Sequence, residues 1–314
     1  MTVNTTTGQQ RSWMETPPRS PTIKHLSGEL VAGMPWLDSI SKPVQSWISK
    51  LYGEPRQPSY RIKDLLNGTW FGHPLHPVFV TIPLGAWTAT LLLDLAWMNE
   101  PDEGTARSAD ITMWLGLAGA TVSAVTGATQ WVDTDGAEQR TGMFHALLNV
   151  GITGLNVAST ILRLTGQRHA AISLSTTAYA ISLYSAYLGG ELSYSDAIGV
   201  NHVAWEGGSD DFVAVMDEQD LVPGKLTRVD AAGIPAVVLK DADGIHAIAA
   251  TCSHLGGPLD EGQLENGIVY CPWHRSGFRM SDGEVVNSPA VCAQPTFTVR
   301  VRNGKIELRR MEHA

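Results

Sequence analysis

The sequence is short of both cysteine and charge. Its 314 residues include three cysteines, too few for the disulfide framework of a small secreted domain. Charged residues make up 17% of the chain and are nearly absent from four long segments between residues 77 and 190. The formal net charge of −9 argues against a nucleic-acid partner, because general nucleic-acid binders carry basic surfaces. These scarcities direct attention to the uncharged segments and to the use of the few cysteines.

Each uncharged segment is long enough to cross a membrane. A transmembrane helix needs about 20 mostly apolar residues, and the candidates are residues 77–98, 111–132, 142–162 and 170–190. A buried soluble bundle is the alternative, but soluble helices show a polar face that these segments largely lack. We interpret residues 71–200 as a four-helix transmembrane domain in the lipid bilayer.

The stretch before the first span reads as a flexible, partly helical cytoplasmic leader, residues 1–70. Within it, residues 43–51 (PVQSWISKL) fit a short amphipathic helix, either at a membrane surface or in solution. Six basic residues lie between Lys24 and the first span, whereas the first link between spans has only Arg107. Lysine and arginine collect on the cytoplasmic side, so we expect a multi-pass protein of the inner (cytoplasmic) membrane with a cytoplasmic N-terminus. Arg163 and Arg168 in the third link weaken this orientation slightly.

The remaining C-terminal part is typical of a small all-β domain. Short apolar or alternating runs are separated by turn signals, and the strongest is Asn303-Gly304 between VRVR and KIELR, which predicts a hairpin. We place a linker at residues 201–210 and the β domain at residues 211–314. Four spans would return this domain to the side of the N-terminus.

Two Cys-His pairs in the β domain carry the most information about chemistry. Cys252 and His254 are followed, after sixteen intervening residues, by Cys271 and His274. Two thiolates and two imidazoles can hold a [2Fe–2S] cluster, with the cysteines on one iron and the histidines on the other. A structural zinc site is the alternative, but zinc fingers usually have a C-x₂₋₄-C … H-x₃₋₅-H order. Here each loop supplies one cysteine and one histidine.

The surroundings of these four residues carry a family resemblance. The stretches CSHLGGPL and CPWHRSGF, and the ending NSPA … FTVRVRNGKIEL, resemble the ferredoxin-type Rieske [2Fe–2S] domain. The membrane half resembles a bacterial family of small four-helix membrane proteins of unassigned function. The matching stretches are GHPLHPVFVTIPLGAWTATLLLDL, HALLN and GGELSY.

The Rieske resemblance also implies how the cluster is tuned. High-potential members carry a disulfide across the cluster, and its positions correspond to Gly257 and Trp273 here, so the domain resembles the ferredoxin and oxygenase class. Ser276 matches a serine that donates a hydrogen bond to cluster sulfide, whereas Phe278 replaces a tyrosine. Arg275 replaces the usual glycine, as a tuning charge or a docking contact. We expect a potential in the lower part of the range of about −150 to +300 mV.

Histidines and one acid mark the membrane half. His73 and His76 precede the first span and His145 lies at the start of the third, so both ends fall on one face of the membrane. They form a candidate site for haem b or quinone, although histidines at helix starts also act as caps or interfacial residues. Asp94 lies within the first span, where an acid faces a cavity or a partner, or reaches the interface.

These observations favour a membrane-anchored electron carrier that passes single electrons to or from a partner protein or quinone. No catalytic residue is assigned, and a component of an oxidoreductase system is favoured over a complete enzyme. One alternative is a membrane oxidoreductase whose helical half binds haem b or quinone, and another is a redox sensor. A complete Rieske oxygenase is disfavoured because its mononuclear iron needs a further large domain.

Overall fold

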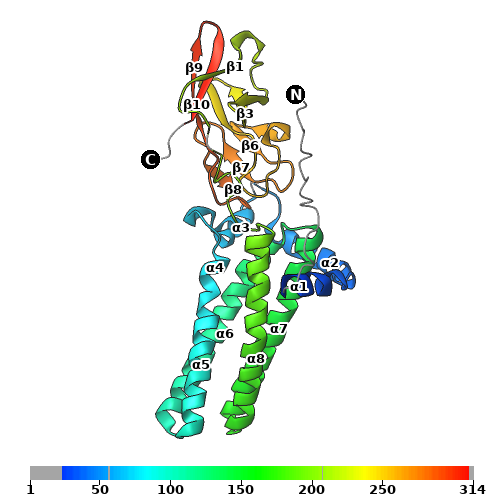
Figure 1. Cartoon of the computed structure of the whole chain (residues 1–314), viewed down its shortest axis with the longest axis vertical. Helices are drawn as coiled ribbons and strands as arrows, with labels where there is room; N and C mark the ends of the chain where they lie inside the picture. Colours follow the sequence, from blue (N-terminus) through cyan, green and yellow to red (C-terminus); the bar gives the residue numbers. More distant parts are fainter. Residues whose placement is uncertain (1–22, 56, 207, 311–314) are drawn as a thin grey trace, which may run out of the picture.

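The structure, a computed structural model, describes residues 23–55, 57–206 and 208–310. A long helical bundle carries a β-rich half stacked on one of its ends (Figure 1). The long helices are α5 (Thr81–Asn99), α6 (Glu103–Trp131), α7 (Gly136–Leu164) and α8 (Arg168–Gly190). The short helix α4 (His76–Phe79) precedes α5, and the π-helical turn η2 (Glu191–Ser195) follows α8.

Three of these helical segments, within the described residues, are long and apolar enough to cross a membrane. They are His76–Asn99, Glu103–Trp131 and Gly136–Leu164. The expectation of four spans is therefore met for three, while α8 completes the bundle as a helix rich in serine, threonine and tyrosine.

Helix α6 begins earlier than the sequence pattern predicts, at Glu103 rather than residue 111. Its start is fixed by Asp102, whose side chain accepts a hydrogen bond from the backbone N–H of Thr105 at 2.9 Å. The apolar run marks only the part of a helix that can face lipid, so polar first turns extend beyond it.

The bundle consists of two similar helical hairpins. ATLLLDL (residues 89–95) in α5 matches ASTILRL (residues 158–164) in α7, and SAVTG (residues 123–127) in α6 matches SAYLG (residues 185–189) in α8. The spacing from His76 to Asp94 equals the spacing from His145 to Arg163. The α5–α6 and α7–α8 hairpins therefore place equivalent residues at equivalent depths.

In the part of the leader that the structure describes, from residue 23 onward, three helices precede the bundle: α1 (Ile23–Ala32), α2 (Trp36–Tyr52) and α3 (Tyr60–Asn67), followed by the turn η1 (Thr69–Phe71). They lie around the end of the bundle that carries the β half (Figure 1). Helix α2 is held there by Tyr52, whose hydroxyl pairs with Thr129 of α6 at 2.7 Å. The leader is thus largely helical from residue 23 onward, and residues 1–22 lie outside the described part.

The β half contains three antiparallel sheets, with strand orders β1-β10-β9, β2-β3-β4 and β5-β6-β7-β8. The strands are β1 (Val213–Asp217), β2 (Thr227–Ala231), β3 (Ile234–Lys240), β4 (Ile245–Ala249), β5 (Gln263–Glu265), β6 (Ile268–Tyr270), β7 (Gly277–Arg279), β8 (Val285–Asn287), β9 (Phe297–Arg302) and β10 (Lys305–Arg310). The helical turns η3 (Glu218–Asp220) and η4 (Leu259–Glu261) lie between strands. Arg302 pairs with Lys305, which confirms the hairpin predicted at Asn303-Gly304.

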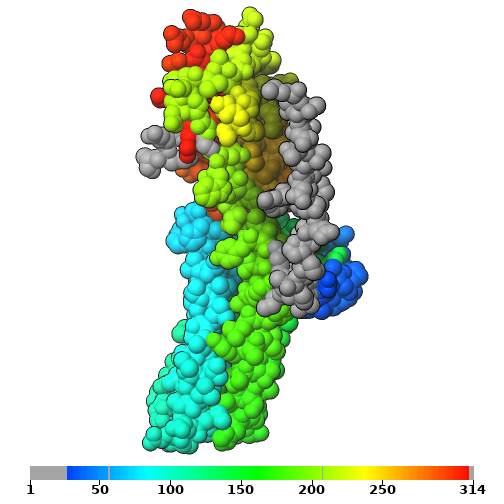
Figure 2. All heavy atoms as spheres, viewed as in Figure 1, coloured from blue at the N-terminus to red at the C-terminus, as the bar shows by residue number. Residues whose placement is uncertain are grey.

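The two halves meet through α3 and the segment after η2. Tyr60 donates its hydroxyl to the Ser288 carbonyl at 3.2 Å, and Asp64 accepts the Ser288 N–H at 2.8 Å. The backbone N–H of His202 donates to the Ser253 carbonyl at 3.1 Å. Together the halves form one elongated body (Figure 2).

Candidate metal centre

Two backbone loops of the β half present the four predicted ligands. In the first, Cys252 donates its N–H to the Gly257 carbonyl at 2.8 Å and accepts the Gly256 N–H at 2.9 Å. In the second, Cys271 donates its N–H to the Ser276 carbonyl at 2.9 Å and accepts the Arg275 N–H at 3.0 Å. The loops therefore have the same hydrogen-bonded form, and each directs one cysteine and one histidine to the same region.

Arg275 has an unusual backbone conformation in this loop. Its φ is +63°, close to that of Gly256 at +79° in the other loop. A left-handed conformation favours glycine, because a Cβ is crowded there. This agrees with glycine being usual at the Arg275 position.

The ligands fall into two pairs. Cys252 and Cys271 are buried and hydrogen-bonded through their side chains. The rings of His254 and His274 lie edge to face with their centroids 5.1 Å apart. One pair of cysteines and one pair of histidines match the donor set of a [2Fe–2S] cluster.

The protonation of the two histidines also fits metal binding. Burial lowers the pKa of His254 to about 3. Burial also lowers the pKa of His274, against the opposing effect of Asp133 and Asp135. The hydrogen bond from Cys252 lowers the pKa of Cys271 to about 7. Both imidazoles are therefore neutral at pH 7, which is the form that coordinates metal.

Gly257 and Trp273 lie together beside the ligands. A Cβ at Gly257 would come within 2.7 Å of Cys271 Sγ and 3.1 Å of the Trp273 ring. All cysteines of the described residues are free. At the two positions where high-potential members of the family carry a disulfide, this protein has Gly257, which has no side chain, and the indole ring of Trp273.

A third loop braces the two ligand loops. Ser276 is fully buried, and its Oγ accepts the N–H of Ala290 at 3.0 Å, which leaves the hydroxyl hydrogen free to donate. Asn287 donates its side-chain amide to the Arg275 carbonyl at 2.8 Å, and Ser253 donates its hydroxyl to the Cys292 carbonyl at 2.7 Å. Sequence reasoning singled out Ser276 but assigned no role to Asn287, which lies in the NSPA stretch, or to Ser253, which lies in the CSHLGGPL stretch.

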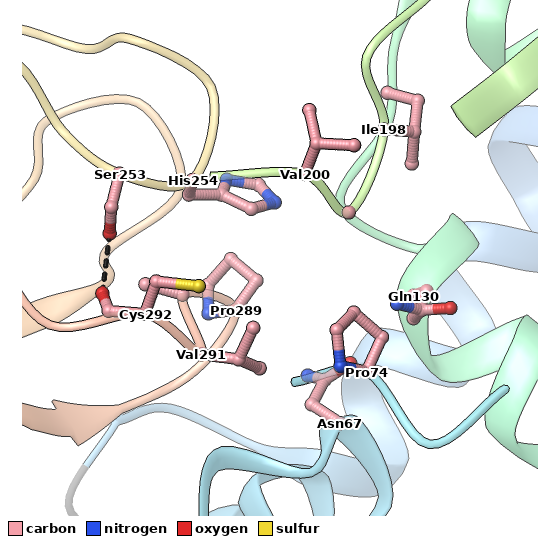
Figure 3. A pocket seen from close by; sticks show the side chains of 12 residues that line it. Asn67, Pro74, Gln130, Ile198, Val200, Ser253, His254, Pro289, Val291 and Cys292 are labelled. Carbon is pink, nitrogen blue, oxygen red and sulfur yellow. Dashed lines mark hydrogen bonds between the residues drawn. The ribbon is translucent and has the colours of Figure 1, made fainter. Parts of the chain in front are cut away.

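The histidine side of the centre faces the helical half. His254 points into a small pocket whose far wall is formed by Asn67, Pro74 and Gln130 (Figure 3). This pocket measures about 20 Å³, room for about one water molecule. His274 borders a second pocket of about 140 Å³, which is also lined by Asp135, Glu138 and Asp196. The edge that would carry the histidine-bound iron is therefore covered by the protein's own bundle.

A buried ion pair of the helical half lies next to this edge. Lys63 of α3 contacts Asp133, just after α6, at 2.7 Å, and their side chains are 7% and 12% exposed. Asp133 Oδ2 has no hydrogen-bond partner, and its carboxylate interacts electrostatically with His274. Sequence reasoning did not identify this pair. Glu54 lies 4.0 Å from Arg275, a contact consistent with docking.

Two of the three histidines singled out in the membrane half come together. His76 and His145 lie within electrostatic reach of each other. Each donates its Nδ1–H to a backbone carbonyl of its own hairpin at 2.9 Å, His76 to that of Ser123 and His145 to that of Ser185. His73 does not join them, because it is exposed and its ring packs on Phe71. Of the two histidines expected to approach His145, His76 does so, and a haem or quinone site at these residues stays a prediction.

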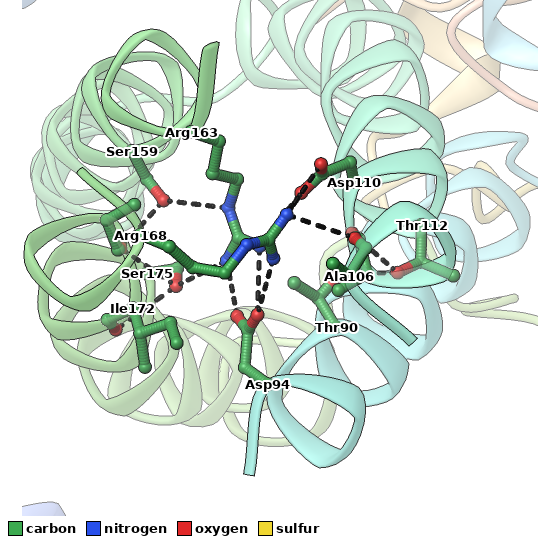
Figure 4. Close-up of polar contacts among 12 residues, drawn as sticks. Thr90, Asp94, Ala106, Asp110, Thr112, Ser159, Arg163, Arg168, Ile172 and Ser175 are labelled. Atoms are coloured by element: carbon green, nitrogen blue, oxygen red, sulfur yellow. Dashed lines mark hydrogen bonds and ion pairs between the residues drawn. The ribbon is translucent and has the colours of Figure 1, made fainter. Parts of the chain in front are cut away.

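Asp94 faces a partner and lies in an ion-pair network at the far end of the bundle (Figure 4). Arg163 binds it through both guanidinium nitrogens, one of them at 2.9 Å, and also reaches Asp110 at 3.1 Å. Arg168 binds Asp110 at 2.7 Å. Arg163 and Arg168, which were counted in the third link, both point into the bundle.

Comparison with known proteins divides the chain at the same place as the structure. Residues 72–202 match the family model of a predicted membrane protein (DUF2231), and residues 211–298 match the Rieske [2Fe-2S] domain. Ferredoxin CarAc of Metapseudomonas resinovorans is 30% identical over 96 residues, which cover 30% of this chain and 90% of the ferredoxin. The ferredoxin component of biphenyl 2,3-dioxygenase from Rhodococcus jostii is 31% identical, over 28% of this chain and 81% of that protein.

A larger relative shares only this domain. Human apoptosis-inducing factor 3 is 32% identical over 101 residues, and the match spans 32% of this chain but only 17% of that protein. With the ligand loops and both family matches in agreement, the chain belongs to the Rieske [2Fe–2S] family, in a form fused to a helical domain of the predicted membrane protein family DUF2231.

Proposed function

We propose that this protein is a membrane-anchored electron carrier whose cluster exchanges electrons through the surface that its own helical half covers. The observation that carries the proposal is the direction of His254 and His274, both of which border pockets walled by the bundle. It acts as one component of an oxidoreductase system, with a redox partner protein as donor or acceptor, and direct contact of that partner with the covered edge would require the two halves to separate. The relative from Rhodococcus jostii is by name the ferredoxin component of a dioxygenase, which supports a protein partner.

Each residue of the proposed site has its own role. Cys252 and Cys271 would hold one iron and His254 and His274 the other, and the bound cluster would supply reversible one-electron chemistry. Gly257 allows the ligand loops to approach closely, and the buried hydroxyl of Ser276 would be available to donate to the cluster. Cys252, His254, Cys271 and His274 form the proposed metal site. Arg275 and Ser276 are proposed to tune it.

We place four spans in the inner membrane, with the N-terminus and the Rieske half on the cytoplasmic side. The inward orientation of Arg163 and Arg168 supports this, because it removes two positive charges from the opposite side's links. The opposite charges of Asp94 and Arg163 cancel, so this pair adds no net charge to the part of the bundle that we place in the bilayer. A quinone does not fit the pocket of about 20 Å³ beside His254, so quinone exchange there would require the halves to separate.

A potentiometric titration of the full-length protein in lipid nanodiscs tests this function. The expected result is a Rieske electron paramagnetic resonance signal that appears and disappears reversibly with a one-electron slope of about 59 mV per decade. A cluster that bleaches irreversibly on reduction would contradict the carrier role. Membrane fractions washed at alkaline pH should retain the protein, and its release would contradict anchoring.

A second candidate function is a membrane oxidoreductase with haem b in the bundle. The matching Nδ1 bonds of His76 and His145 favour it, since a metal-binding histidine commits its other nitrogen to such a carbonyl. Asn149 weighs against it, because its amide lies 3.2 Å from His145 Nε2 and would have to turn away. A dithionite-reduced optical spectrum decides. A sharp haem band, lost in His76→Ala and His145→Ala but kept in His73→Ala, supports this candidate, and iron–sulfur bands alone exclude it.

A further inference from the structure

Helix α2 exposes a continuous apolar stripe. Five residues on one side of it are between 36% and 63% exposed: Trp36, Ile40, Val44, Trp47 and Leu51. Their spacings of four, four, three and four residues keep them on one face of a helix with about 3.6 residues per turn. The stripe runs almost the whole length of the helix, so it is not a set of scattered surface residues.

A different face of the same helix holds it to the bundle. Leu37, Ser41, Ile48 and Tyr52 are buried at matching helical spacings. Their burial already supplies the packing that a soluble amphipathic helix needs. The exposed stripe is therefore a second apolar face, beside the packed one, and α2 has apolar side chains in excess of those that the described fold buries.

The remaining side of α2 is polar. Lys42, Ser46, Ser49 and Lys50 are exposed there. Basic residues beside an apolar face with tryptophans are typical of helices that lie in a membrane interface, where the lysines meet anionic headgroups.

The position of α2 fixes where the stripe lies along the bundle. Gln45 donates its amide to the carbonyls of Trp131 and Thr134, at 3.0 and 2.9 Å. Arg140, in the first turns of α7, binds Asp38 at 2.6 Å. Helix α2 is thus tied to the α6–α7 connection, where the chain leaves one candidate span and enters the next.

Exposed aromatic side chains at the same end of the bundle extend the pattern. Trp70 is 66% exposed and Phe71 is 45% exposed in η1, directly before the first candidate span. Tryptophan is enriched at the boundary between membrane and water. The exposed aromatic residues of η1 and the stripe of α2 therefore lie at the same end of the bundle.

We propose that α2 lies in the headgroup region of the membrane that the bundle crosses, with this stripe turned toward the acyl chains. The occupant of the stripe is the bilayer itself. This inference rests on the bundle spanning the membrane. It gives the leader a role: α2 fixes the height of the bundle, and through α3 the height of the Rieske half above the lipid.

Nitroxide accessibility in nanodiscs with anionic lipid tests the inference. In a Cys292→Ser background, single labels are placed at Trp47→Cys and Leu51→Cys on the stripe, and at Ser49→Cys on the polar face. A further label at Val150→Cys, which is 69% exposed on α7, reports on the bundle itself. Power saturation with oxygen and with a nickel chelate then separates lipid from water, with the cluster kept oxidised and its content checked in every variant.

The expected result is a several-fold higher ratio of oxygen to nickel collisions at Trp47 and Leu51 than at Ser49. High nickel accessibility at both stripe positions would overturn the inference, since the stripe would face water. Exclusion of both reagents would overturn it as well, by indicating a second copy or another protein. Failure of the Val150 label to report lipid would instead contradict the membrane-spanning bundle.

Discussion

The two halves of the molecule position their polar side chains by opposite means. In the β half, each of two short backbone loops presents one cysteine and one histidine, Cys252 with His254 and Cys271 with His274. In the helical half, polar side chains far apart in sequence hold one another across helices, as Arg163 and Asp94 do. A loop site depends on local backbone geometry, whereas a helical pair depends on its partner. A substitution in the helical half should therefore leave the cluster signal of the β half largely unchanged, and a substitution in the ligand loops should leave the stability of the helical bundle largely unchanged.

The largest effect is expected from the ligands. His274→Ala should abolish the Rieske electron paramagnetic resonance signal and reduce bound iron, because one iron loses half of its protein ligands. His202→Ala is the matched control, since His202 lies beside the site but binds it only through its backbone N–H. Loss of the signal in the control, or its survival in His274→Ala, would contradict the assignment of the ligands.

At the end of the bundle far from the β half, we expect a large effect on stability and no effect on the cluster. Arg163→Leu should destabilise the bundle by about 3–5 kcal/mol, because it leaves the Asp94 carboxylate buried and poorly compensated. The double variant Asp94→Leu with Arg163→Leu should recover most of that loss. Thermal unfolding in nanodiscs measures both, and an unchanged Rieske signal in all variants would support the independence of the halves.

Substitutions at the contact between the two halves should, by contrast, change the properties of the cluster. Asp133→Asn leaves the buried Lys63 cation near His274, so the reduced cluster is favoured and the potential should rise by roughly 30–60 mV, where 59 mV is a tenfold change for one electron. Lys63→Met should lower the potential by a similar amount, because it leaves the Asp133 anion. Potentiometric titration at fixed pH gives both values. Shifts of the same sign would show that repacking, rather than charge, controls the potential.

The smallest effect is expected within the loops. Ser276→Ala removes a hydroxyl donor and the acceptor of the Ala290 N–H, so the potential should fall by a few tens of millivolts and stability by about 1–3 kcal/mol. Ser253→Ala removes the comparable bond to the Cys292 carbonyl. It should cost stability without moving the potential. Equal potentials in the two variants would remove Ser276 from the tuning of the cluster.

Local patterns in the sequence predicted the β half well. The spacing of the Cys-His pairs identified the ligand loops, and Asn303-Gly304 identified a hairpin that the strand register confirms. Both signals lie within a few residues, where chain geometry alone determines the contact. The same reasoning missed Asn287, because its role is to reach the Arg275 carbonyl from another loop.

The helical half was harder to predict for a physical reason. Hydropathy finds apolar runs, but it does not show which face of a helix a charged residue occupies. Arg163 therefore looked like part of a polar link, although it binds Asp94 inside the bundle. The Lys63–Asp133 pair joins two segments that no sequence pattern connects. The polar start of α6 was missed for the same reason.

The covalent connection between the halves has a kinetic consequence. Since one chain carries both the histidine edge and the surface that covers it, their encounter is intramolecular, at an effective concentration on the order of millimolar for a short linker. Any electron exchange across this contact is then a first-order event whose rate is independent of how dilute the protein is in the membrane. Only the electron transfer to or from an outside partner depends on the amount of protein in the membrane. Measuring both rates at several protein-to-lipid ratios therefore separates the intramolecular step from the step that involves the partner.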